Sequence, residues 1–171
     1  AGLSVGSVYQ YYPNKQAILF DLARRWLSTF PAIIEARRDA AMPGDGTAFR
    51  QHLRAYLDDI AKLYLDNAGL LPVLDAMMLD PDLKPIATEY DERIVALYAG
   101  WLQRAEPRIP HETAGRLGLL MMEVAHVSMT RGVHRGDAGF ALVIDDIERM
   151  WLALLAPHLE VGLDRADPRS L

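Results

Sequence analysis

Apolar residues recur at steps of three and four along most of the chain, which is the spacing of one face of a helix. The first stretch starts at Asn14 and carries Ala17, Ile18, Leu22, Trp26 and Phe30. Asn14 is placed to cap this helix, and Pro31 is expected to kink or end it. The pattern predicts a helix of four turns or more after residue 14.

Turn-forming residues separate the later apolar stretches. Thr47 is the expected cap of the second helix, and Gly136 and Gly139 are expected to bracket the turn before the last. Pro81 ends a short apolar segment. The later helical stretches are predicted at 47–66, 70–79, 83–105, 110–134 and about 140–158.

Strand signals are almost absent, so we expect an all-α fold of six or seven helices. Residues 150–156 are apolar on every side, which predicts burial on every side. Surplus apolar surface on the last two helices favours a homodimer. The alternative is that the last helix is simply the central helix of the bundle. The predicted interface residues are Leu117, Met121, Val124, Ile147, Trp151 and Leu154.

The composition is that of a globular chain: 171 residues, 51% hydrophobic and 24% charged. Because there is no cysteine, a disulfide framework, a thiolate metal site and a cysteine nucleophile are excluded. No apolar run has the length of a membrane span, and no leader is visible. We therefore expect a soluble, cytoplasmic protein with no membrane partner and no cofactor.

Charge is unevenly distributed along the chain. Residues 1–30 have a net charge of +2, from Lys15, Arg24 and Arg25 against Asp21, while the whole chain has −5. Nucleic acid would repel the acidic remainder, so contacts with a phosphate backbone are expected only from the N-terminal end or from a few local bases.

The N-terminal residues predict a short helix with an unusual surface. Gly2 supplies a turn, Ser4 is placed as a cap, and Pro13 stops a helix over 5–12. Its outward side chains are small or polar and uncharged. Such a surface is typical of one that lies close to something polar.

This string resembles the turn and recognition helix of the tetracycline-repressor family of transcription regulators. The match comprises the turn glycine and cap serine, Gly-Ser-Val-Tyr-Gln-Tyr-Tyr at 6–12, then Asn14, Lys15 and the apolar pair at 18–19. Gln16 departs from the acidic residue that is usual there, as do Tyr12 and Ile18 from the usual phenylalanine and leucine. The family has a first helix and most of a second before this point, so the resemblance implies that this chain lacks them.

The resemblance implies two parts and a DNA partner. Residues 1–30 would be a partial helix-turn-helix with the start of the connecting helix, and 31–171 a ligand-binding and dimerisation domain. Double-stranded operator DNA would bind only with the missing N-terminal residues restored. Gln10 is the best direct reader, since its amide pairs with adenine. The implied base-edge contacts are Val5, Gly6, Gln10 and Tyr11, and the implied phosphate contacts are Ser7, Tyr9 and Lys15.

The resemblance also implies a small-molecule effector, for which we expect an apolar or aromatic compound. Bulky, adaptable or polar side chains in apolar helices are the candidates for its pocket. Each of them has the alternative interpretation of an ordinary core residue. They are Tyr64, Met77, Met78, Tyr98, Trp101, Met121, Met122, Glu123 and His126.

Two other interpretations remain open. Glu123 and His126 form a Glu-x-x-His pair of the kind that di-iron helical bundles use, but the second pair such centres need is missing. No nucleophile, phosphate-binding or dinucleotide motif is present, so no catalytic or metal residue is predicted. The other alternative is a dimeric interaction module without a small-molecule ligand, which would not need a cavity of ligand size.

Overall fold

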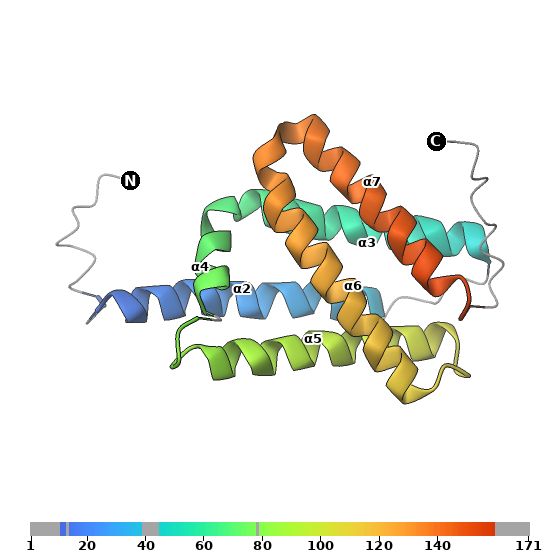
Figure 1. The fold of residues 1–171 in the computed structure, drawn as a ribbon, viewed down its shortest axis with the longest axis horizontal. Helices are drawn as coiled ribbons and strands as arrows, with labels where there is room; N and C mark the ends of the chain where they lie inside the picture. Colours follow the sequence, from blue (N-terminus) through green and yellow to red (C-terminus); the bar gives the residue numbers. More distant parts are fainter. Residues whose placement is uncertain (1–10, 13, 39–44, 78, 160–171) are drawn as a thin grey trace.

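The computed structural model describes residues 11–12, 14–38, 45–77 and 79–159, and every regular element among them is helical (Figure 1). The prediction of an all-α fold is confirmed. The elements are α2 (Lys15–Arg38), α3 (Gly46–Asp66), a 3-10 turn (Ala68–Leu70), α4 (Leu71–Met77), α5 (Lys84–Ala105), α6 (His111–Gly132), a 3-10 turn (Val133–Arg135) and α7 (Gly136–Leu155).

The ends of the first two helices confirm one predicted cap and correct another. Asn14 caps α2, because its side-chain oxygen accepts the amide of Ala17 at 2.8 Å. Thr47 is not the cap of α3: Asp45 accepts the amide of Ala48 at 2.8 Å, and the helix begins at Gly46. Asp and Thr are both good caps, so the sequence alone did not separate them.

Pro31 does not end the first helix, which was one of its two predicted effects. α2 continues through Pro31 to Arg38. Phe30 and Ile34, on either side of the proline, are both buried in the core. Packing on both sides offsets the backbone hydrogen bond that proline cannot make. α2 also spans residue 30, where the sequence predicted the boundary between two parts.

The turn before the last helix is shorter than predicted. Gly136 has a φ of 74°, in the left-handed region that favours glycine. Because the 3-10 turn before it already reverses the chain, α7 begins at Gly136. Gly139 therefore lies inside α7 and does not bracket the turn.

Some helices pack side by side and others cross. α2 and α5 lie side by side along the length of the molecule, α6 crosses α5, and α7 packs against α6 and α3 (Figure 1). A Cβ atom at Gly118 of α6 would lie 3.0 Å from both Tyr98 Cβ and Val95 O of α5. The glycine thus allows the two helices to approach closely.

Three aromatic side chains join α3, α5 and α7 in the core. Trp151 is only 1% exposed. Its ring stacks on Tyr56 with centroids 6.0 Å apart and meets Tyr98 edge-on at 5.7 Å. The hydroxyls of the two tyrosines share a hydrogen bond. These three residues, which we call the packed cluster, anchor α7 inside a single chain.

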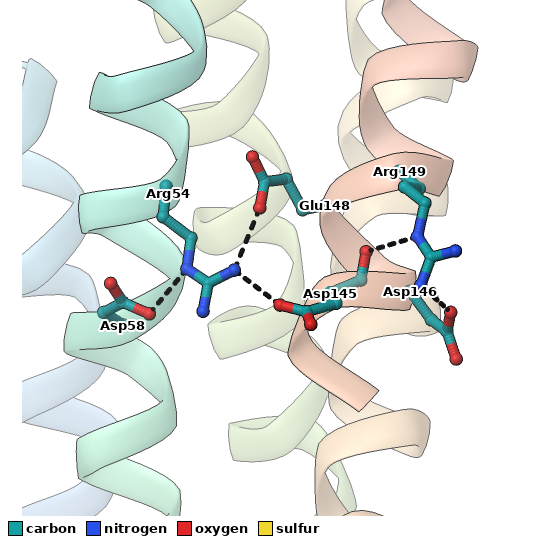
Figure 2. Close-up of polar contacts among 6 residues, drawn as sticks. All are labelled: Arg54, Asp58, Asp145, Asp146, Glu148 and Arg149. Atoms are coloured by element: carbon teal, nitrogen blue, oxygen red, sulfur yellow. Dashed lines mark hydrogen bonds and ion pairs between the residues drawn. The ribbon is translucent and has the colours of Figure 1, made fainter. Parts of the chain in front are cut away.

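An ion-pair network on the surface also joins α3 to α7. Figure 2 shows Arg54 of α3 reaching across to Asp145 and Glu148 of α7, at 2.6 and 3.1 Å, while its Nε contacts Asp58 at 2.9 Å. The hydrogen bond with Asp145 contributes most to raising the pKa of Arg54, so the guanidinium stays charged. On the outer side of α7, Arg149 pairs with Asp146 at 2.9 Å.

Candidate functional site

A cavity of about 340 Å³ lies between α2, α3, α4, α5 and α6. Ligand pockets usually have volumes of roughly 300 Å³ or more, so this space is large enough for a small organic molecule. The described lining residues are Trp26, Leu27 and Phe30 of α2; Ile60 and Tyr64 of α3; Leu74, Asp75 and Met77 of α4; Ala87, Tyr90, Asp91 and Ile94 of α5; and Met122, Glu123, Ala125 and His126 of α6.

Aromatic rings form the wall between α2 and α3. Trp26 and Phe30 are one helical turn apart, so both point to the same face of α2. The Trp26 ring meets Tyr64 edge-on, with centroids 5.0 Å apart, and Phe30 meets the same tyrosine edge-on at 6.5 Å. This geometry is favourable for aromatic pairs, and it holds three ring systems in fixed positions beside the cavity.

A polar chain crosses one side of the cavity. The hydroxyl of Tyr64 and Nδ1 of His126 share a hydrogen bond of 2.6 Å. Nε2, on the other edge of the imidazole, lies 3.8 Å from Asp75 Oδ1. Burial lowers the pKa of His126 despite the opposing effects of Asp75 and Glu123, so the ring is neutral near pH 7. Burial likewise raises the pKa of Tyr64, which stays protonated.

Two more carboxylates complete the polar lining. Asp91 is half-buried, and burial together with the nearby Glu123 raises its pKa to about 6. Glu123 and Asp75 are exposed although they line the cavity, so they lie at its opening. The cavity therefore has an apolar, aromatic interior and an acidic opening.

The structure brings together five of the nine predicted pocket residues: Tyr64, Met77, Met122, Glu123 and His126. Tyr98 and Trp101 instead line a space of only about 10 Å³, which is too small for a ligand. Met121 is fully buried in the core and does not line the cavity. Met78 lies outside the described residues.

Sequence reasoning missed the α2 wall and two of the acids. Trp26 and Phe30 look like the core face of a connecting helix, which they also are. Asp75 and Asp91 look like solvated charges. A usable signal was present in Tyr90 and Asp91, a bulky phenol next to an acid within an apolar helix face.

The burial of four predicted interface residues corrects the predicted position of the dimer interface. Leu117, Met121, Ile147 and Trp151 are in the core of the single chain, so a second copy has no surface there to cover. Val124 and Leu154 are half-buried. The apolar periodicity was real, but it identified the inner face of α6 and α7. Large apolar side chains are exposed on other faces of these helices: Leu119, Leu120 and Val127 on α6, and Leu142 and Met150 on α7.

Most of the predicted DNA-contacting residues lie outside the described residues: Val5, Gly6, Ser7, Tyr9, Gln10 and the side chain of Lys15. Tyr11 is described and is 82% exposed. Next to it, the Tyr12 hydroxyl donates to Asp21 of α2 at 2.7 Å. This bond connects the segment before α2 to the helix.

Glu123 and His126 are not part of a larger cluster of metal-binding side chains among the described residues. No group of three or more His, Cys, Asp or Glu side chains in this part of the chain is arranged to hold a metal ion. Glu123 and His126 both line the cavity, where the histidine bonds to Tyr64. Among the described helices, none is long and apolar enough to cross a membrane.

Comparison with known proteins places the chain in a family. The model of the tetracyclin repressor-like, C-terminal domain family matches residues 49–155, more than half of the chain. No curated protein and no solved structure matches it. The matched segment runs from α3 to the last residue of α7 and supplies four of the five walls of the cavity. The chain belongs to the tetracycline-repressor family of regulators.

Proposed function

We propose that this chain is the effector-binding and dimerisation part of a non-enzymatic transcriptional repressor, which binds operator DNA as a homodimer and changes its DNA affinity when a small molecule enters the cavity. One observation carries the proposal. Trp26, Leu27 and Phe30, which line the cavity, belong to α2, the helix that directly follows the segment resembling a recognition helix. Such a regulator acts where the DNA is, in the cytoplasm.

A ligand that contacts α2 is well placed to move it as a unit. The helix has 24 residues and is therefore about 36 Å long. Trp26 lies near its middle, so a tilt at the cavity displaces the N-terminal end of α2. The Tyr12–Asp21 bond passes that displacement to the preceding segment. A ligand produces this shift only to the extent that it binds one arrangement more tightly than the other.

The displacement matters because a dimer reads two half-sites. Two recognition helices must lie roughly 34–36 Å apart, or a multiple of this, to enter successive major grooves. A tilt of α2 in each subunit changes that separation. Release of DNA by effector is therefore the expected direction.

The exposed apolar residues of α6 and α7 are the proposed dimer surface. Leu120, Val124 and Val127 follow one another at steps of four and three, so they form one stripe on α6. Leu142 and Met150 add apolar surface on α7. Exposed apolar residues that follow one face of a helix are typical of an interaction site.

Sedimentation velocity tests the dimer surface. Val127→Glu should convert the dimer to a monomer, because it would bury a charge in the interface. Leu65→Glu, at an exposed apolar position of α3, is the matched control and should stay dimeric. A dimeric Val127→Glu variant would exclude this stripe from the interface.

The effector proposal is tested with a fusion of this chain to a complete helix-turn-helix. The DNA probes are duplexes that this fusion selects from a library of random sequences. A library of aromatic amphiphiles of all charge types is screened by thermal shift. Compounds that raise the Tm should change DNA affinity by about tenfold or more, a typical allosteric coupling.

A pair of α5 variants locates the binding. Ala87→Met fills part of the cavity and should abolish both the thermal shift and the effect of the compound on DNA affinity. Ala96→Met, at an exposed position of the same helix, should abolish neither. Compounds that bind in the cavity and leave DNA affinity unchanged would contradict the proposed function.

A further inference from the structure

The charges around the cavity point to one class of effector. Within the described part of the chain, neither Asp91 nor Glu123 makes a hydrogen bond or an ion pair, although the two are close enough for Glu123 to affect the titration of Asp91. Asp75 reaches only the neutral His126. Among the described residues that line the cavity, none is a lysine or an arginine. Three acids thus share a ligand-sized cavity without a positive partner.

Several other acids among the described residues are paired with an arginine. Asp145 and Glu148 both bind Arg54, and Glu35 binds Arg93 at 2.8 Å. Partly buried like charges without a counter-ion repel each other and carry a desolvation cost. Asp91, half-buried beside Glu123, has no such partner among the described residues, and a positively charged ligand would relieve this cost.

The other residues that line the cavity indicate what kind of molecule would carry the positive charge. Trp26, Tyr64 and Tyr90 line the cavity together with aliphatic side chains. Aromatic faces attract organic cations. A hydrated metal ion gains nothing from such a wall, whereas an apolar body does.

We propose that the effector is an amphiphilic organic cation, an amine or quaternary ammonium on an aromatic or aliphatic body, whose charge sits between Asp91 and Glu123 and whose apolar part lies against the Trp26–Tyr64 wall. This inference rests on the proposed function of the cavity and adds the chemical class of its ligand. It narrows the expectation of an apolar or aromatic compound by requiring a positive charge.

The charge of Asp91 makes the binding depend on pH. Because its pKa is raised to about 6, Asp91 loses its negative charge as the pH falls from about 7.5 to 5. This change weakens the attraction for a bound cation, so the affinity for the cation should fall over that interval. The titratable groups that share the cavity with Asp91 are Tyr64 on α3, Asp75 on α4, Tyr90 on α5, and Glu123 and His126 on α6.

Isothermal titration calorimetry on this chain tests the proposal with three probes that share a phenylbutyl body and differ in the charge of the head group: phenylbutyltrimethylammonium, phenylbutanol and phenylpentanoate. The cation should bind about tenfold or more tightly than the neutral alcohol, and the anion most weakly. Asp91→Asn should lower the affinity for the cation about tenfold and change the affinity for the alcohol by no more than about twofold. Glu123→Gln should also lower the affinity for the cation and leave that for the alcohol nearly unchanged.

Glu89→Gln is the matched control for Asp91→Asn, because it removes one charge from an exposed position of α5. It should change none of the three affinities. Equal binding of the three probes, or full cation affinity in Asp91→Asn, would overturn the charge inference while leaving a ligand site in place. If none of the probes binds, the inference fails outright. The effector function is then judged separately, by the library screen and the Ala87→Met variant.

Discussion

The packed cluster and the cavity are built from the same two helices, yet only one of them has room for a ligand. α3 gives Tyr56 to the packed cluster and Tyr64 to the cavity, and α5 gives Tyr98 and Tyr90 in the same way. Each pair is eight residues apart, so the tyrosines recur on nearly the same helix face. The space beside Tyr56 and Tyr98 is about 10 Å³, whereas that beside Tyr64 and Tyr90 is about 340 Å³.

The difference comes from what closes the third side. α7 reaches the packed cluster, where Trp151 packs against both tyrosines. No described residue of α7 lines the cavity, whose remaining walls are α2, α4 and α6. A helix face can thus serve as core at one end and as a binding wall at the other, according to which neighbour covers it.

The largest predicted effect separates the two tryptophans. Trp151→Ala should lower the free energy of unfolding by about 3–5 kcal/mol, because the indole is surrounded on every side. Trp26→Ala should cost less, since one side of that ring already faces empty space. Urea unfolding followed by circular dichroism measures both. Equal losses would mean that the two regions are packed alike.

A smaller effect is expected from a methyl group added to α6. Gly118→Ala should lower the free energy of unfolding by about 1–3 kcal/mol, because the new Cβ meets the backbone of α5. Gly115→Ala on the same helix has no atom within 4 Å of its new Cβ and should gain up to about 1 kcal/mol from helix propensity. Thermal unfolding of the pair compares them directly. A Gly118→Ala variant as stable as its control would show that α5 and α6 are not held in close contact.

The smallest predicted effect concerns Asp91. Its pKa is raised from 3.8 to about 6, so its charge costs stability above about pH 6, and that cost disappears as the pH falls below about 4. Asp91→Asn should therefore raise the free energy of unfolding at about pH 7.5 by about 1 kcal/mol or less, and change little at about pH 4. A variant less stable than the parent at neutral pH would show that a positive group already pairs with Asp91.

Helix positions could be predicted from the sequence because the apolar spacing is regular and Asn14 is a strong cap. Pro31 misled the prediction, since local propensity gives no account of the packing of Phe30 and Ile34 that holds α2 together. The choice between Asp45 and Thr47 depended on backbone geometry that neither residue type specifies.

The site was predictable only in part, for a physical reason. Tyr64 and His126 stood out as polar groups in apolar faces, and they do lie together. Trp26 has the same spacing whether it packs against a side chain or faces a cavity. Likewise, the periodicity of α6 placed Leu117 and Leu120 on apolar faces without showing that the first is core and the second exposed. Only the positions of neighbouring helices separate these cases.

The most direct test of the coupling between the cavity and α2 is a distance measurement. Because the sequence has no cysteine, Arg24→Cys supplies a single spin label per subunit at an exposed position of α2. Pulsed dipolar spectroscopy on the dimer, with and without phenylbutyltrimethylammonium, should show the distance between labels shift by a few ångströms. An unchanged distribution at a concentration that calorimetry shows to be saturating would contradict the account.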